Sequence, residues 1–258
     1  MRAVITTILL GCLCLMGPVS AEEGVVDEVL ESPGAGVVLE SSEKNVDPFE
    51  SINRPLFAFN NQLDKWILRP VAKGYDFVMP DPAQRGVGNF FANLYDFNSA
   101  LNALLQARFE GAAQGGGRFL VNSTLGVFGL FDVATRMGIR PYRTDFGHTL
   151  ALWGVPSGPY IMVPLFGPRT FRSGTGTVVD TYSSVPMLFV DDNTVRNTIW
   201  GVELVDGRSR LLAADELLSG DRYIFIRDAY LQQREYFVND GKVEDNFSDY
   251  DDEWEEEF

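Results

Sequence analysis

The chain has 258 residues, 45% of them hydrophobic, which suggests one large domain or two small ones with a substantial core. Its formal net charge is −15, but the acidic excess lies at the two ends. Residues 22–43 hold seven acidic side chains and no basic one, and residues 244–258 hold nine and none. The body between them is neutral, which excludes the basic surface that nucleic-acid binding requires.

The N-terminus has the pattern of a secretory signal peptide. Arg2 is followed by an apolar stretch over residues 3–16 and by a small-residue site that ends at Ala21. We expect cleavage after Ala21, because the apolar run is too short for a membrane span. The alternative is a lipoprotein signal, since residues 9–12 (LLGC) resemble a lipobox. The apolar run continues through Cys12, however, which favours simple cleavage.

Cysteine and histidine usage limits the chemistry of the mature chain. Cys12 and Cys14 both precede the predicted cleavage site, so the mature chain has no disulfide, thiolate zinc site or cysteine nucleophile. The lipase motif G-x-S-x-G is absent, because residues 154–158 (GVPSG) have the wrong spacing. We therefore predict no catalytic residue, no metal site and no cofactor, and we interpret His148, the single histidine, as structural.

Start signals and apolar spacing predict a mainly helical body over residues 46–240. Residues 22–45 are expected to form a flexible acidic linker, and residues 241–258 a disordered acidic tail. Asp-Pro pairs at 47 and 81 mark helix starts, and Pro55 is expected to kink or restart the first helix. The predicted helices are 47–68, one that starts at 81 and carries residues 90–94, and 98–106, 109–125, 145–153, 169–182, 194–212 and 221–238.

Two apolar stretches, residues 119–134 and 150–166, are interrupted by polar residues, glycine or proline, so neither offers the roughly 20 residues of a spanning helix. Within the first stretch, residues 126–131 (GVFGLF) predict an apolar loop or hairpin. Such a loop either fills the core or faces another apolar phase. On these residues alone, core filling is favoured.

Several arginines lie beside apolar segments, among them Arg54, Arg69 and Arg118, with Asn53 and Asp132 close by in the sequence. An arginine in such a place can hold a lipid phosphate. The alternative is an internal salt bridge that fixes helix packing, which we favour for each of them.

Four ordered segments resemble the motifs of the MlaA/VacJ family. Residues 47–54 (DPFESINR) resemble D-P-[LFW]-E-x-[FIL]-N-R, and residues 68–72 (LRPVA) contain the R-P-V-A element. Residues 118–134 (RFLVNSTLGVFGLFDVA) resemble R-F-x-x-N-[ST]-x-x-G-x-x-G-x-x-D-x-A. Residues 145–160 resemble the run that includes F-G, W-G-V and G-P-Y. The motif residues are Asn53, Arg54, Arg69, Pro70, Arg118, Asn122, Asp132, Gly147 and Gly154.

The resemblance implies a ring-like assembly of amphipathic helices around a central amphipathic channel, with no spanning helix. It places the protein at the periplasmic face of a Gram-negative outer membrane, bound to a trimeric porin. Phospholipid mislocalised to the outer leaflet would pass through it to a periplasmic carrier protein. We assign the channel or its gate to the apolar loop, namely Gly126, Val127, Phe128, Gly129, Leu130 and Phe131.

Two other functions stay open, a structural porin accessory without a lipid path and a phospholipase-like enzyme. The chain also departs from the family in two respects. Many members are lipoproteins, whereas simple cleavage is expected here. The acidic C-terminal tail carries more charge than the family pattern requires, and we interpret it as solvated or as a contact for a basic carrier.

Overall fold

The computed structural model describes residues 47–216 and 220–241. The predicted signal peptide with Ala21 and Cys12, the linker, and nearly all of the acidic tail lie outside these ranges. The elements in chain order are α2 (Glu50–Leu63), the π-helix η1 (Asp64–Leu68), α3 (Arg69–Val78), α4 (Asp81–Leu105), α5 (Phe109–Thr124), α6 (Val133–Arg136), α7 (Phe146–Leu152), β1 (Tyr160–Val163), β2 (Gly167–Thr170), α8 (Phe171–Ser183), α9 (Val185–Phe189), α10 (Asn193–Arg210), the 3₁₀ turn η2 (Ala213–Glu216) and α11 (Arg222–Val238).

The first helical stretch is longer than predicted. Segments α2, η1 and α3 follow one another without a gap, so the stretch ends at Val78 rather than near residue 68. Pro55 lies inside α2 and does not restart it. Proline removes the hydrogen bond to the carbonyl four residues earlier. That carbonyl belongs to Ser51, which is exposed, so water can replace the lost donor.

Helix α4 is one continuous helix where the sequence predicted two. Asp96, Asn98 and Ser99 lie within this helix, and each bonds to a residue of another segment. Helix α5 packs along α4 as a helical hairpin. Gly115 permits this close approach, because a Cβ there would lie 2.9 Å from the carbonyl oxygen of Asp96.

The antiparallel hairpin of β1 and β2 was not predicted. It pairs Tyr160 with Thr170 and Val163 with Gly167, so the helix expected to start at residue 169 begins two residues later. Tyr160 and Met162 point from β1 into a small core that Tyr223 and Tyr230 of α11 complete.

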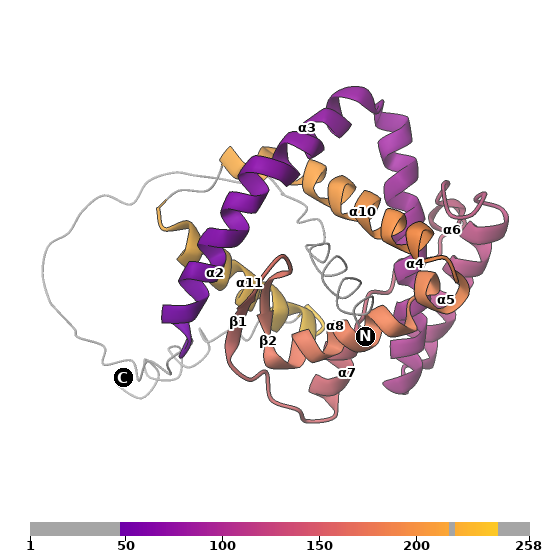
Figure 1. Cartoon of the computed structure of the whole chain (residues 1–258). Helices are drawn as coiled ribbons and strands as arrows, with labels where there is room; N and C mark the ends of the chain where they lie inside the picture. The colour runs from indigo at the N-terminus through magenta and orange to yellow at the C-terminus, as the bar shows by residue number, and fades with distance from the viewer. Residues whose placement is uncertain (1–46, 217–219, 242–258) are drawn as a thin grey trace, which may run out of the picture.

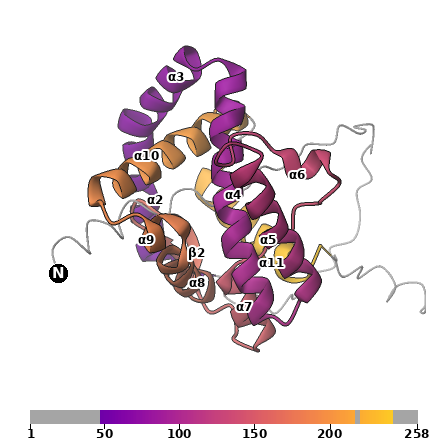
Figure 2. The ribbon, with the colours of Figure 1, turned by 90° about the vertical axis from the view of Figure 1, so that its right-hand side faces the viewer.

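The elements close into a ring. Helix α3, reached through η1, packs on α10, α10 on α9, α9 on α8, α8 on β2, and the hairpin returns to α2 through β1. Figure 1 shows this circuit face-on, and Figure 2 shows it from the side, with the α4–α5 hairpin in front. Helix α11 packs against β2 and α7. The predicted mainly helical ring is therefore confirmed. Within the described ranges, no helix is long and apolar enough to cross a bilayer.

Candidate functional site

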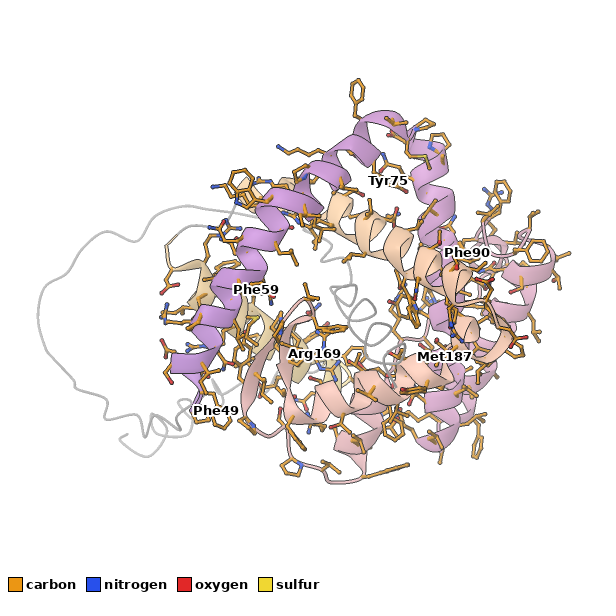
Figure 3. The ribbon with its side chains drawn as sticks, in the orientation of Figure 1. Phe49, Phe59, Tyr75, Phe90, Arg169 and Met187 are labelled. Carbon is orange, nitrogen blue, oxygen red and sulfur yellow. The ribbon has the colours of Figure 1, made fainter. Side chains whose placement is uncertain are left out.

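The distribution of polarity in the described residues is inverted relative to a water-soluble domain. Eleven hydrophobic side chains are buried, against 17 polar or charged ones, while 32 large hydrophobic side chains are exposed. Trp66 in η1 is 73% exposed and Phe77 in α3 is 91% exposed. Figure 3 shows Phe59 on α2, where its side chain is 52% exposed. An apolar surface of this extent requires an apolar partner.

Arg118 organises a buried polar cluster between α4, α5 and α6. Its Nε lies 2.9 Å from Oδ2 of Asp96, and its Nη2 lies 3.2 Å from both carboxylate oxygens of Asp132. Burial raises the pKa of Asp96 despite the guanidinium. Burial would also raise the pKa of Asp132, but hydrogen bonds from Thr135 and the charge of Arg118 outweigh it and lower that pKa. The internal salt bridge is thus confirmed for Arg118.

Asn122 joins the same cluster from one turn farther along α5. Its Nδ2 donates to Oδ1 of Asp132 over 3.2 Å, and its Oδ1 accepts from the backbone N–H of Ala134 over 2.9 Å. The motif over residues 118–134 therefore folds onto itself, with Arg118, Asn122 and Asp132 as mutual partners. Its spacing encodes a buried hydrogen-bond network between α5 and α6.

The motif over residues 47–54 ties α2 to the hairpin and to α11. Asn53 is buried; its Nδ2 donates to Oδ1 of Asp47 over 2.8 Å and its Oδ1 accepts from the N–H of Met162 over 2.8 Å. Arg54 forms ion pairs with Glu50 at 2.6 Å and with Asp221 at 2.7 Å. The polar side chains Asn53 and Arg54 of this motif therefore face protein partners.

The remaining motif residues are also placed by protein contacts. Arg69 pairs with Asp215 at 3.1 Å, and Pro70 occupies the first turn of α3. Gly147 is buried in α7, where that helix packs on α8. Gly154 lies just after α7 with φ +84°, a conformation that glycine adopts without strain.

His148 lies in a packed environment. Its ring is buried, with Nδ1 3.2 Å from Oγ1 of Thr144 and Nε2 3.8 Å from the carboxylate of Asp240. Burial lowers its pKa, which favours the neutral ring. Asp145 accepts from the backbone N–H of His148 and pairs with Arg234, as expected of a helix cap. Over residues 47–216 and 220–241, no cluster of three His, Cys, Asp or Glu side chains has the geometry of a metal site.

The apolar loop is exposed, so the expectation that it fills the core is wrong. Phe128 is 75% exposed and Phe131 58% exposed, and Val127 and Leu130 are exposed as well. Hydrogen bonds order the loop: Gly129 N–H donates to the carbonyl of Asn122, and Phe131 N–H to that of Gly126. These bonds hold Val127 and Phe128 at φ +52° and +57°, a left-handed conformation that is uncommon for such side chains.

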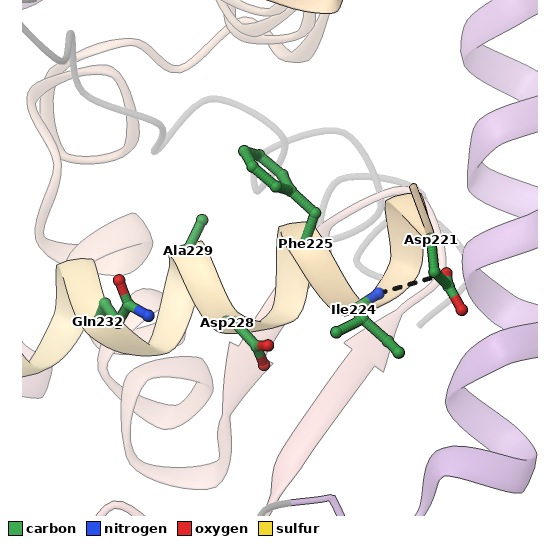
Figure 4. Close-up of a pocket in the computed structure, with 6 residues that line it drawn as sticks. All are labelled: Asp221, Ile224, Phe225, Asp228, Ala229 and Gln232. Atoms are coloured by element: carbon green, nitrogen blue, oxygen red, sulfur yellow. Dashed lines mark hydrogen bonds between the residues drawn. The ribbon is translucent and has the colours of Figure 1, made fainter. Parts of the chain in front are cut away.

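A hollow of about 560 Å³ follows one face of α11, as Figure 4 shows. Two of the six residues that line it are acidic, Asp221 and Asp228. Both are neutralised within the chain: Asp221 pairs with Arg54, and Asp228 with Arg227 at 2.8 Å. Asp221 also caps α11 through the N–H of Tyr223 at 2.9 Å. Each acidic side chain of this hollow therefore already has an ion-pair partner within the chain.

A second hollow, of about 280 Å³, lies where the α4–α5 hairpin meets α9 and α10. Phe90 and Leu94 of α4, Phe119 of α5 and Phe128 of the loop line one part of it. The sequence motif pointed to Phe128 as a residue of the channel or its gate, but no motif pointed to Phe90, Leu94 or Phe119. Their apolar spacing on two separate helices gave no sign that they share a surface.

Two carboxyl groups have pKa values far above their usual range. Burial raises the pKa of Asp180 to about 7, and it raises the pKa of Glu203 to about 7 with a further contribution from Asp206. Tyr95 O–H donates to Oε1 of Glu203 over 2.5 Å across the interface of α4 and α10. The folded protein therefore binds protons on these groups between about pH 4 and 7, where the unfolded chain releases them.

We predict that Glu203→Gln stabilises the protein at pH 8 by about 1–2 kcal/mol, because glutamine keeps the bond from Tyr95 without a buried charge. A raised carboxyl pKa gives stability at low pH that is lost as pH rises through 7, so the advantage of the variant should vanish near pH 5. Denaturant unfolding at both pH values measures this, with Asp180 unchanged in both proteins. An equal difference at pH 5 and 8 would contradict the assignment.

Comparison with known proteins agrees with this architecture. The model of the MlaA lipoprotein family matches residues 45–237. The Escherichia coli protein named intermembrane phospholipid transport system lipoprotein MlaA is 36% identical over 204 residues, 76% of this chain and 80% of that one. An uncharacterized protein of Rickettsia typhi is 37% identical over 195 residues, 74% of this chain and 78% of that one.

A solved structure, described as the structural basis for maintenance of bacterial outer membrane lipid asymmetry, superimposes with a TM-score of 0.66 at 38% identity. The superposition covers 74% of this chain and 98% of that one. The residues that the family model matches span the helical ring and all four motifs. The chain belongs to the MlaA lipoprotein family.

Proposed function

We propose that this protein is the outer-membrane component of a retrograde phospholipid transport system. It takes phospholipid that has reached the outer leaflet and passes it through the ring toward a soluble periplasmic carrier. Its location is the periplasmic side of the Gram-negative outer membrane, and its partners are phospholipid, a trimeric porin and the carrier. The name of the Escherichia coli relative supports phospholipid transport, and the direction and the two protein partners are part of the proposal.

The observation that carries the proposal is the inverted polarity of the closed ring. Exposed side chains such as Trp66, Phe77 and Phe131 would each be unfavourable in water, while the buried polar network around Arg118 holds the elements together without a large apolar core. Interhelical polar contacts of this kind remain effective in an apolar medium, where packing of apolar side chains gains little from excluding water. The ring is thus suited to lie in one leaflet without a spanning segment.

Deleting the gene is expected to raise phospholipid in the outer leaflet and to make the outer membrane sensitive to detergent. Both effects should disappear when the intact gene is restored. Labelling of surface phospholipid in intact cells measures the first. Unchanged surface phospholipid would contradict the transport function and favour a structural porin accessory. Release of free fatty acid from phospholipid vesicles by the purified protein would instead revive the enzyme alternative.

A further inference from the structure

The hollow between α4, α5, α9 and α10 has the lining of a hydrocarbon site. Phe90, Phe119 and Phe128 supply aromatic faces, and Val185 and Val190 supply aliphatic ones. Among the described residues that line it, none is charged. Its volume of about 280 Å³ is near the lower limit of small-molecule pockets, which fits one narrow chain better than a whole lipid.

Asn93 adds an independent sign of a ligand at the wall of this hollow. Its side chain is 2% exposed, and its Nδ2 donates to Oγ of Ser123 over 2.8 Å. Its Oδ1 is buried and has no hydrogen-bond partner in the described part of the chain. An unmet buried amide oxygen is unfavourable, so a polar atom supplied from outside the chain would stabilise it.

The amide of Asn93 can bond to either a hydrogen-bond donor or an acceptor of a ligand, depending on which way the amide is turned. The hydroxyl of Ser123 can donate as well as accept, so the amide can turn over and place its Nδ2 where Oδ1 now lies, on a residue that lines the hollow. In that orientation, Ser123 donates to Oδ1, and Nδ2 can donate to an ester carbonyl. The hollow then offers an apolar wall with one amide donor, which matches a hydrocarbon chain that carries one carbonyl group.

The hollow is continuous with exposed apolar surface. Phe128 belongs both to its lining and to the apolar loop, whose other large side chains are exposed. Gly129 keeps the loop close to Asn93, since a Cβ at that glycine would lie 2.7 Å from the Asn93 side chain. A chain that leaves a lipid phase beside the loop can therefore enter the hollow past Phe128.

We propose that this hollow, which we call the acyl groove, binds one fatty acyl chain of a glycerophospholipid, with the amide of Asn93 donating to the ester carbonyl of that chain. The inference rests on the proposed function, which brings phospholipid to the protein. It gives the apolar loop a specific role, because Phe128 forms the lip of the groove.

The test uses the full-length protein, reconstituted in vesicles of phosphatidylethanolamine that carry a photoreactive diazirine on one acyl chain. After illumination, mass spectrometry of the peptides locates the adducts. Adducts are expected in the groove segments, residues 90–94 and 185–190. Trp66, on the exposed surface of η1, is the reference for ordinary contact with the bilayer.

Val190→Trp fills the groove and should lower adducts at residues 90–94 at least fivefold while leaving the reference unchanged. The matched control is Val195→Trp, at an exposed position of α10 outside the groove, which should leave both unchanged. Helix content by circular dichroism establishes that both variants fold. If Val190→Trp does not fold, Ile199→Trp fills the groove from α10 instead.

Each other outcome has a definite meaning. Adducts at Trp66 but not in the groove would overturn acyl-chain binding in the groove and leave the proposed function standing. Adducts at neither place would overturn both the acyl groove and the proposed function. Equal loss in Val190→Trp and Val195→Trp overturns the groove. Preferential labelling by a diazirine fatty acid would make the ligand a free fatty acid and overturn the glycerophospholipid assignment. Labelling that appears only after a co-purifying porin is removed would show that protein covers the groove, which also overturns the proposal.

Discussion

Replacing Arg118 by methionine is expected to lower the free energy of unfolding by roughly 3–5 kcal/mol, because it leaves a buried carboxylate without its counter-charge. Asp96 is 2% exposed, and its Oδ2 accepts a hydrogen bond from the Nε–H of Arg118. The substitution also removes the donors to Thr135 and to the carbonyl of Ile139. Folded abundance and denaturant unfolding measure the loss.

Arg136→Met is the matched control, because Arg136 is an exposed arginine of the adjacent helix α6. It should change stability by less than about 0.5 kcal/mol. Adding Asp96→Asn to Arg118→Met should recover part of the loss, since it removes the unpaired charge. The deficit should also shrink as pH falls, because Asp96, whose pKa burial already raises, can take up a proton. If Arg118→Met and Arg136→Met behave alike, the cluster does not stabilise the ring.

Phe131→Asp and Phe128→Asp are expected to leave the amount of folded protein unchanged and to raise surface phospholipid as much as deleting the gene does. Both side chains are exposed, so a charge there creates no buried unpaired group in the protein. It does place a carboxylate where an acyl chain or lipid surface would lie, and an unpaired charge in an apolar phase costs several kcal/mol.

Thr124→Asp, an exposed position at the end of α5, is the control for charge alone and should keep lipid asymmetry intact. Folded abundance and surface phospholipid are measured together. Loss of the folded protein would show that the phenylalanines stabilise the core after all. Normal abundance with normal asymmetry would mean that the loop neither gates a channel nor contacts lipid, and the assignment of residues 126–131 would be wrong.

Local signals in the sequence predicted much of the helical framework. Asp145 is the N-cap of α7, at the start of the helix predicted from residue 145. The Asp-Pro pairs at 47 and 81 lie near helix starts as predicted, but the N-caps there are Phe49 and Pro80, without a side-chain capping bond. The errors arose where tertiary contacts replaced local preference. The two helices predicted from residue 81 and over residues 98–106 are one helix, α4, and polar side chains near its middle have partners in other helices. Asp96 accepts from Arg118 of α5, and Asn98 donates to the carbonyl of Asp180 in α8.

The hairpin escaped prediction for a related reason. Its strands have four residues each, too few for alternation to be recognised, and β2 contains Pro168 and Arg169. What stabilises it lies far away in the sequence: Asn53 and Asn60 of α2 bond to its backbone. The exposure of the apolar loop could not be predicted from the sequence either, because apolar composition alone does not distinguish core from lipid-facing surface. The acyl groove could not be predicted either, because its lining comes from four helices that are separate in the sequence.

Closure of the ring has a consequence for how the chain folds. The contacts that hold α2 come from the far end of the sequence: Asn53 bonds to β1, 107 residues later, and Arg54 to Asp221, 167 residues later. A chain delivered N-terminus first therefore holds its first helix without partners until β1 is delivered. Leu56 and Phe57 of that helix, which pack against the core that α11 completes, stay uncovered until α11 follows. Truncation before β1 should therefore leave an open arc with an uncovered first helix rather than a smaller ring, because β1 is the element that returns the circuit to α2.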